Sequence, residues 1–149
     1  MKILKSKNGF TLIELLIVIA ILGLLASIVL VGLGGARAKA RDARRIADLR
    51  QVQNALEIYY ASKGNYPAGD WAGMTGNADW SSLGVTKFSQ DPLNGSGGHP
   101  FYSYATNGQY YVLQATLEQD NPALKDDIDG SVLSLDCDDS PHYYYCVQF

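Results

Sequence analysis

The chain has 149 residues, of which 47% are hydrophobic and 18% are charged, so it supports one small domain and at most one long element besides. Its net charge is only −3, but residues 1–50 carry nine Lys/Arg against three Asp/Glu, and residues 51–149 carry three against twelve. This asymmetry excludes a uniformly charged, disordered chain and a wholly basic nucleic-acid-binding domain.

An uncharged apolar run from Leu15 to Ala36 is the most prominent feature of the sequence. At about 1.5 Å per residue the run spans about 33 Å as a helix, which matches a hydrocarbon core of about 30 Å. Basic residues flank it on both sides, so loop charge does not orient it. A secretory signal peptide, cut at a site like Ala36-Arg37-Ala38, is an alternative. The run is longer than the usual 7–15 residues of a signal core.

Glu14 lies inside the apolar stretch that begins at Phe10. An acidic group at membrane depth costs about 2.5–3.5 kcal/mol, so its presence indicates a function and requires a partner. The alternative is that Glu14 lies near the end of the span and reaches the headgroup layer.

The segment Lys-Asn-Gly-Phe-Thr-Leu-Ile-Glu-Leu-Leu, residues 7–16, resembles the class III leader and first turn of the type IV pilin superfamily. Gly9 stands before the cut, Phe10 is the new N-terminus, and Glu14 is the fifth residue after it. The likeness continues through residues 45–56. It ends at residues 59–67, which are similar to the segment that closes the long helix in type II secretion major pseudopilins and related pilins.

This resemblance implies that residues 1–9 are a leader peptide, which a membrane prepilin peptidase removes between Gly9 and Phe10 before methylating the new amine. The mature chain would be a single-pass inner-membrane protein, held in lipid before assembly. Inner-membrane assembly platform proteins would then add it to identical subunits in a helical filament, extracellular or periplasmic. Glu14 would pair with the amine of Phe10 from a neighbouring subunit, and Thr11 would add a hydroxyl contact. Two buried charges are tolerated only when paired.

The sequence departs from the family at Val31, where relatives commonly carry a proline. Three glycines follow within four residues, at Gly32, Gly34 and Gly35. Because glycine destabilises a helix interior by up to about 1 kcal/mol, this region is a candidate for softening during assembly. Equally, the small residues would permit close helix packing.

Beyond residue 36 the pattern becomes that of an amphipathic helix, with one apolar stripe at helical spacing. The stripe consists of Ile46, Leu49, Val52, Leu56 and Tyr59; largely off it lie Arg44, Arg45, Asp48, Arg50, Gln51 and Asn54. The predicted helix runs from about Phe10 to Ser62, with Gly64 as its stop. The basic cluster at 37–45 is interpreted as a solvated, membrane-proximal face, with anionic headgroups, DNA or acidic neighbours as alternative partners.

Residues 64–100 contain turn-forming sequences and are predicted to be a loop. The large apolar side chains expected to hold the loop on the body are Trp71, Trp80, Leu83 and Phe88. A short helix is possible around Trp80–Leu83.

Strands are predicted at Phe101–Thr106 and Gln109–Glu118, joined at Asn107-Gly108 by a type I′ turn, with further candidates at Ser131–Leu135 and Tyr143–Phe149. The face expected against the long helix consists of Tyr111, Leu113, Ala115 and Leu117. The expected fold is therefore α+β, with a long N-terminal helix packed on a small antiparallel sheet. It divides into a transmembrane or filament-core helix at 10–36, an amphipathic helix at 37–63 and a C-terminal globular domain at 64–149.

Cys137 and Cys146 are the only cysteines, and in an exported domain they are expected to form a disulfide. Nearby, Asp120, Asp126, Asp127 and Asp129 offer hard oxygen ligands. The pseudopilins that this chain resembles carry calcium in a comparable loop. The spacing forms no complete calcium loop, so the expectation is a solvated acidic surface and no cofactor. Calcium at Asp126, Asp127 and Asp129 is the alternative.

The sequence contains no phosphate-binding loop, metalloprotease motif or nucleophile elbow, so the chain is not expected to be an enzyme. The expected function is that of a structural subunit of a type IV pilus or a type II secretion-like pseudopilus. Two alternatives stay open: a minor tip pilin that binds a ligand such as DNA, and a membrane-anchored binding domain that does not polymerise.

Overall fold

The computed structural model describes residues 9–93 and 102–149, without the side chains of residues 29–33. Most of the expected leader and the turn-rich segment 94–101 therefore lie outside the described residues. The chain forms two compact units, Met1–Arg37 and Ala38–Phe149. The second unit contains the sheet.

The first element, α1, is a helix from Leu12 to Lys63, as the sequence predicted to within two residues. The helical backbone continues through residues 31–35 without interruption, although three of them are glycine. The helix ends at Gly64, whose φ of +75° stops it and whose N–H donates to the carbonyl oxygen of Tyr60 at 2.8 Å.

The sequence also predicts a membrane span within this helix. Among the residues that the structure describes, no helix is long and apolar enough to cross a membrane.

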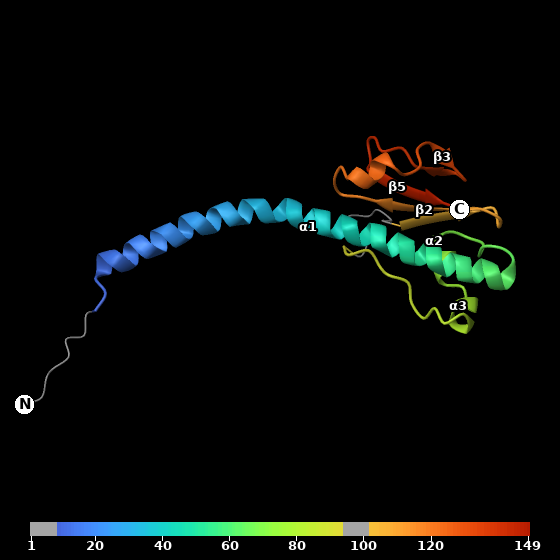
Figure 1. The fold of residues 1–149 in the computed structure, drawn as a ribbon, viewed down its shortest axis with the longest axis horizontal. Helices are drawn as coiled ribbons and strands as arrows, with labels where there is room; N and C mark the ends of the chain where they lie inside the picture. Colours follow the sequence, from blue (N-terminus) through green and yellow to red (C-terminus); the bar gives the residue numbers. More distant parts are fainter. Residues whose placement is uncertain (1–8, 94–101) are drawn as a thin grey trace, which may run out of the picture. The chain divides into compact units, whose positions relative to one another are not determined.

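Two short helices follow α1 in the connection to the sheet (Figure 1). The helix α2, Trp71–Thr75, was not predicted; Asp70 caps it by accepting a hydrogen bond from the N–H of Gly73 at 2.9 Å. The helix α3, Asp79–Ser82, matches the predicted turn of helix and buries Trp80. Met74 and Trp80 enter the core, and the indole N–H of Trp80 donates to the carbonyl oxygen of Met74 at 2.6 Å.

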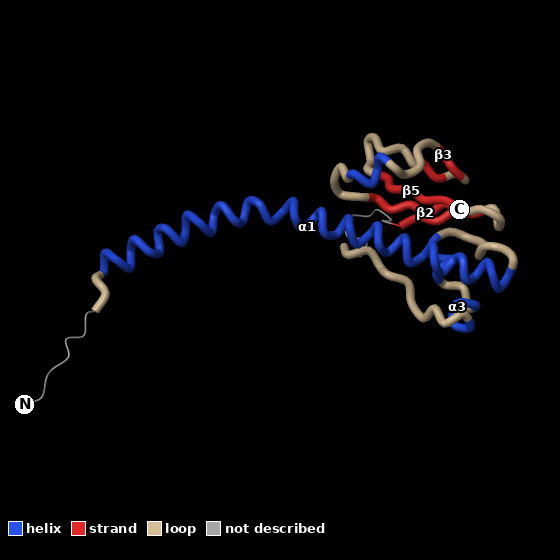
Figure 2. Tube along the Cα trace, in the orientation of Figure 1, coloured by secondary structure: helices blue, strands red, loops and turns tan. Residues whose placement is uncertain are grey.

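The main sheet is antiparallel, with strand order β1-β2-β5 (Figure 2). Its strands are β1, Tyr102–Thr106; β2, Tyr111–Thr116; and β5, Tyr144–Gln148. The register pairs Tyr104 with Leu113 and Gln114 with Cys146. A helix on a small antiparallel sheet is the α+β fold that the sequence predicted.

The turn between β1 and β2 differs from the prediction. A type I′ turn needs positive φ at both central residues, but of Asn107 and Gly108 only Gly108 has it. Instead the connection has four residues, and the side chain of Asn107 accepts hydrogen bonds from the N–H groups of Gln109 and Tyr110, at 3.0 and 2.8 Å. The asparagine amide thus closes the turn in an Asx arrangement.

The two faces of β2 are both covered, which explains why Tyr111 to Ala115 are all buried. One face packs against the second half of α1, as expected from the alternation, in a cluster that includes Leu49, Leu56, Tyr111 and Leu113. On the opposite face, Val112 packs with the two cysteines in a smaller cluster. The sequence analysis assigned no cover to that face.

The second face is covered by the segment between β2 and β5, which contains the 3-10 helix η1, Pro122–Lys125, and a two-stranded hairpin. The hairpin pairs β3, Ser131–Val132, with β4, Leu135–Asp136. The prediction of a single strand over Ser131–Leu135 was therefore wrong. Leu133 and Ser134 both have positive φ and form the tight turn.

Candidate functional site

The N-terminal motif is described from Gly9 onward. Gly9 is exposed, and a Cβ added there would meet nothing within 4 Å, so packing does not require glycine at this position. Phe10 is 89% exposed. Within the part of the chain that the structure describes, packing therefore explains neither Gly9 nor Phe10.

Thr11 and Glu14 form a capping box at the start of α1. The backbone N–H and hydroxyl of Thr11 both donate to Oε2 of Glu14, at 2.8 and 2.7 Å, and the N–H of Glu14 approaches the Thr11 hydroxyl oxygen at 3.3 Å. The sequence analysis expected the Thr11 contact but looked for the Glu14 partner only among cations. The Thr-x-x-Glu spacing was the available signal for this local partner.

The apolar side chains that follow are uncovered by the chain itself. Every large apolar residue described from Phe10 to Ile28 is between 48% and 89% exposed. An apolar surface of this extent on a protein indicates a membrane or a protein partner.

Arg45 is the centre of a buried charge cluster in the second unit. Its side chain is 0% exposed and pairs with carboxylates from three segments. Asp42 lies one turn earlier in α1 at 2.7 Å, Asp91 lies in the connection after α3 at 2.5 Å, and Glu118 follows β2 at 2.6 Å. Asp42 also accepts the N–H of Glu118 at 2.9 Å. The cluster therefore joins α1 to both the connection and the sheet.

Arg41 completes this cluster through a two-point ion pair with Glu118, in which its Nε donates at 2.7 Å. Hydrogen bonding from Arg41 is the main reason that the pKa of Glu118 is lowered to about 2. Burial opposes the charged form of Arg45, but its hydrogen bonds to Asp91, Glu118 and Asp42 outweigh burial, so the pKa of its guanidinium is raised.

The structure corrects the interpretation of the polar residues around 37–54. Arg45 and Asp48 were placed off the buried stripe, yet both are buried, with Asp48 accepting the hydroxyl of Tyr102 at 2.8 Å. The signal was present, because Arg45 lies four residues before Leu49 and Asp42 lies three residues before Arg45, which continues the stripe toward the N-terminus. Of the basic cluster, Arg41 and Arg45 are bound within the chain, and Arg44 stays exposed.

The segment after α1 connects the C-terminal end of the helix to the sheet through ring packing and hydrogen bonds. The ring of Tyr66 lies between those of Tyr60 and Tyr111, with centroids 4.7 and 4.6 Å away, and its N–H donates to the carbonyl oxygen of Gly108 at 2.9 Å. The hydroxyl of Tyr104 donates to the carbonyl oxygen of Pro67 at 2.8 Å. The Tyr66-Pro67 segment thus has a structural role in this chain.

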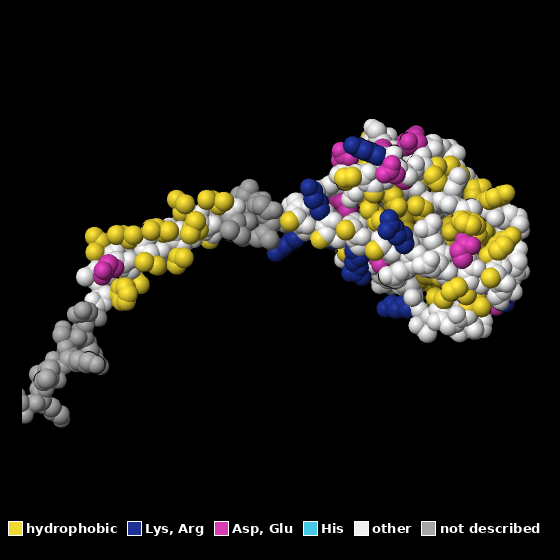
Figure 3. All heavy atoms as spheres, in the orientation of Figure 1, with side chains coloured by type: hydrophobic (Ala, Val, Ile, Leu, Met, Phe, Trp, Pro, Cys, Tyr) yellow, Lys and Arg dark blue, Asp and Glu magenta, His cyan; other side chains and the backbone are white. Residues whose placement is uncertain are grey.

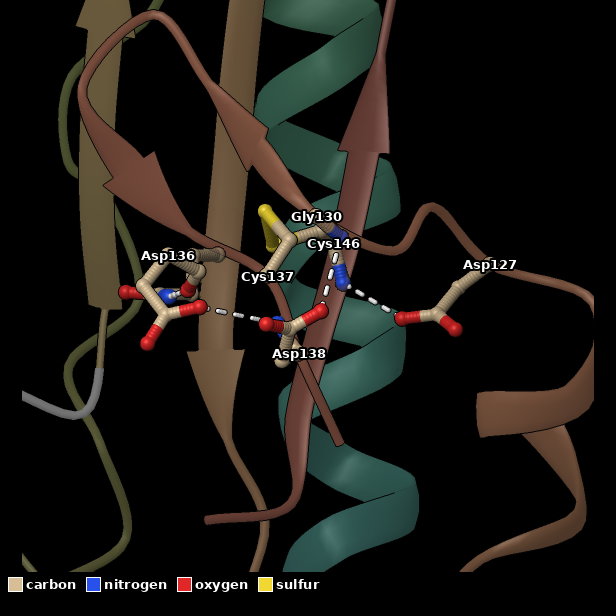
Figure 4. Close-up of a disulfide and its surroundings, with 7 residues drawn as sticks. Asp127, Gly130, Asp136, Cys137, Asp138 and Cys146 are labelled. Atoms are coloured by element: carbon tan, nitrogen blue, oxygen red, sulfur yellow. Dashed lines mark hydrogen bonds between the residues drawn. A yellow bond between two sulfur atoms is a disulfide. The ribbon is translucent and has the colours of Figure 1, made fainter. Parts of the chain in front are cut away.

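Cys137 and Cys146 form a disulfide on the outer face of the sheet (Figure 4). Cys146 lies in β5, which β2 already holds by strand pairing, and Cys137 follows β4. The N–H of Cys137 donates to the carbonyl oxygen of Gly130 at 2.9 Å. The bridge therefore holds the β3–β4 hairpin on the sheet.

Replacing both cysteines with serine should lower the free energy of unfolding by about 2–3 kcal/mol, because the bridge closes a loop between cysteines that are nine positions apart. Denaturant unfolding of the purified protein measures this change. Amide exchange should rise in the β3–β4 hairpin and not in β1 and β2. Two free thiols in non-reducing peptide maps of protein from the cell surface would contradict the pairing.

Three carboxylates beside the disulfide form a group that could hold a cation. Oxygens of Asp127, Asp129 and Asp139 lie within 4.8 Å of one another. One oxygen of Asp127 accepts the N–H of Cys146 at 2.8 Å, but its Oδ1 and the Oδ1 of Asp139 are buried without a hydrogen-bond partner among the described residues. Asp126, which the sequence analysis grouped here, is exposed and outside the group, whereas Asp139 was missed.

Burial and neighbouring negative charge raise the pKa of two of these carboxyl groups. Burial is the main cause for Asp127, whose pKa is raised to about 6, and the nearby charges of Asp139 and Asp129 add to it. Burial, followed by the charge of Asp129, also raises the pKa of Asp139. The neighbouring negative charges thus add to the effect of burial in opposing ionisation of Asp127 and Asp139.

Comparisons with known proteins agree with the N-terminal motif. The family described as "Prokaryotic N-terminal methylation motif" matches residues 4–30. Type II secretion system core protein G is 39% identical over 70 residues in Vibrio cholerae and 37% identical over 67 residues in Escherichia coli. These alignments cover 47% and 45% of this chain, and 48% and 46% of the relatives. The chain thus spans about half the length of these relatives.

A match of greater extent is to a fimbrial protein of Neisseria meningitidis, 36% identical over 129 residues, which cover 87% of this chain and 65% of the relative. No solved structure matches. The methylation motif, the helix-on-sheet fold and relatives of both kinds support one interpretation: the chain is similar to the type IV pilin and type II secretion pseudopilin superfamily.

Proposed function

We propose that the chain is a structural subunit, not an enzyme, which polymerises into a type IV pilus or a type II secretion-like pseudopilus. The uncovered apolar helix surface from Phe10 to Ile28 carries this proposal, because it must be covered by lipid or by other chains. Relatives named as fimbrial and type II secretion core proteins support it.

The proposed sequence of events begins in the inner membrane, where the apolar surface is covered by lipid. Prepilin peptidase removes residues 1–9 and methylates the amine of Phe10, and assembly platform proteins pass the subunit to the filament. There identical subunits replace lipid around the helix, extracellularly or in the periplasm. Glu14 then pairs with the Phe10 amine of a neighbour.

Filament imaging tests this function. Filaments sheared from cells and examined by electron microscopy should contain this chain as a stoichiometric component. A chain that stays wholly in the membrane fraction under conditions where the cell makes filaments would favour the membrane-anchored binding domain. Presence at the filament tip alone would favour the minor pilin.

Processing gives a separate test, in which Gly9→Val should abolish cleavage. Because a Cβ at Gly9 meets nothing, the substitution should leave the fold intact and act only on recognition by the peptidase. Mass spectrometry of the membrane-extracted wild-type protein should find a methylated N-terminus at Phe10, and the variant should keep its leader. A wild-type N-terminus at Lys39 would instead indicate secretory cleavage.

We also propose that the C-terminal loop binds Ca²⁺ through Asp127, Asp129 and Asp139. The two buried carboxylate oxygens without partners support a hard cation, which prefers such oxygens and would relieve their repulsion. A bound cation would fix the loop that carries the disulfide.

Calcium chloride should raise the melting temperature of the wild-type protein relative to EGTA, and Asp139→Asn should abolish the increase. Asp126→Asn is the matched control, since it removes an exposed carboxylate of the same loop. The increase should weaken as the pH falls through about 6, because protons then compete for Asp127. In EGTA the pH dependence of stability has the opposite sign. Because the pKa of Asp127 is raised from 3.8 to about 6 on folding, the free energy of unfolding increases as the pH falls from 6 toward 3.8. Equal melting temperatures in both solutions at pH 7.5 would refute the site.

A further inference from the structure

A groove with two cationic side chains lies beside α1 in the second unit. It has a volume of about 540 Å³ and is lined by Arg44 of α1 and by residues 87–92 of the connection, including Lys87. Both cations are exposed. The carboxylate in the lining, Asp91, is already bound to the buried Arg45, so it does not neutralise them. We call this the cationic groove.

Arg44 has only a weak partner within the described part of the chain. Its Nε lies 3.7 Å from Asp48, and that carboxylate already accepts a hydrogen bond from Tyr102 at 2.8 Å. Lys87 takes part in no ion pair with a described residue. The groove therefore presents positive charge for a partner outside the chain.

The segment between β2 and β5 has the opposite charge. Residues 120–139, which we call the acidic loop, contain seven Asp and one Lys. Its exposed carboxylates are Asp120, Asp126, Asp129, Asp136 and Asp138. Asp120 and Asp126 accept no hydrogen bond and form no ion pair with a described residue through their side chains, and neither belongs to the trio proposed to bind calcium.

The two surfaces lie apart on the same unit. Figure 1 shows the segment after α3 on one side of α1 and η1 with β3 on the other. In Figure 3, several Asp and Glu side chains and one basic side chain lie over the C-terminal loops, while the other Lys and Arg side chains in view lie along α1 and below it. No residue of the acidic loop lines the cationic groove of its own copy in the described structure.

We propose that the cationic groove of one subunit binds the acidic loop of a neighbouring copy. This contact deepens the proposed function and rests on it. Two different patches joined in this way make a heterologous contact, which repeats from copy to copy and gives an open helical filament or a ring. Charge complementarity of this kind sets the register and the partner more than it adds affinity. The contact would thus select this chain over other subunits.

Charge reversal tests the contact. Arg44→Glu/Lys87→Glu and Asp120→Lys/Asp126→Lys should each lower the yield of sheared filaments at least tenfold, because like charges then face each other. Lys39→Glu/Arg50→Glu is the matched control, since it makes the same change in charge at exposed positions outside the groove, and its yield should stay within twofold of wild type.

Combining the groove reversal with the loop reversal distinguishes loss of the contact between subunits from misfolding of the subunit. Both reversals in one chain should restore the yield to within threefold of wild type. The two reversed chains expressed together should also assemble, alternating along the contact, although neither assembles alone. Wild-type yield from either reversal, or failure of both compensations, would overturn the proposal. Neutralising variants, Lys87→Gln and Asp126→Asn, give a milder test if a reversal prevents the Cys137–Cys146 bridge from forming, and both should halve the yield or reduce it further.

The control arms distinguish this proposal from the function on which it rests. Wild-type cells without filaments would contradict the proposed function. Normal filaments from every reversed variant would contradict the groove contact alone. Loss of assembly in the groove variant that the reversed loop does not rescue would assign the groove to another anionic partner and refute the loop.

Discussion

Arg45→Met should lower the free energy of unfolding by about 3–5 kcal/mol, the loss expected when a buried ionic partner is removed and its counter-charges stay. Methionine fills much of the same volume, but Asp42 and Asp91 would then lose their buried ion-pair partner, and Glu118 would keep only Arg41. We therefore expect a fall in the melting temperature of at least about 10 °C, measured by near-UV circular dichroism of the detergent-solubilised protein.

Arg44→Met is the matched control, because this neighbouring arginine has a 58% exposed side chain and a single long ion pair. Its loss should change stability by less than about 0.5 kcal/mol. An equal effect of the two substitutions would show that the buried cluster does not hold the unit together.

The pH dependence of this stabilisation follows from Glu118. Its pKa is about 2 in the folded protein against an ordinary value of 4.5, so the folded state favours the charged form. The contribution is complete above pH 4.5 and is lost as the pH falls toward 2. Arg41 supplies the largest part of this shift and remains in Arg45→Met, so the difference between wild type and the variant should shrink only in part over that interval.

Glu14→Ala should be expressed and folded but should enter filaments poorly. The Phe10 amine of a neighbour would lose its counter-charge on burial in the filament, at a cost of a few kcal/mol for each subunit added. Loss of the capping box adds about 1 kcal/mol at the start of α1. Shearing and electron microscopy measure the filament yield, and normal yield would show that the carboxylate does not determine assembly.

The capping box makes a sharper comparison possible. Glu14→Gln keeps an acceptor for the Thr11 donors, because glutamine also serves in a capping box, but it removes the charge. Thr11→Ala keeps the charge and removes the hydroxyl. If the charge is required, Glu14→Gln assembles poorly and Thr11→Ala assembles nearly normally. The reverse result would mean that helix capping, not ion pairing, is the role of Glu14.

Much of the fold could be predicted because it depends on local periodicity. The stripe from Leu49 to Tyr59 predicted the buried face of α1, and Gly64 predicted its end. Alternation along β2 predicted which face meets the helix. The prediction of a type I′ turn was wrong because the side-chain oxygen of Asn107 accepts hydrogen bonds from two N–H groups that follow it. The Asn-Gly dipeptide alone does not specify this arrangement.

The sequence by itself determined the N-terminal motif, the helix and the class of protein, since each depends on residues close together in the chain. Only the tertiary structure decided the roles of Arg45 and Asp139. The helical spacing places Arg45 in line with the buried stripe, but its partners Asp91 and Glu118 are distant in sequence and become known only in the folded chain. Asp139 joins Asp127 and Asp129 because the disulfide and the β3–β4 hairpin fold the segment back on itself. Charges act through space, so their partners become known only when distant segments are brought together.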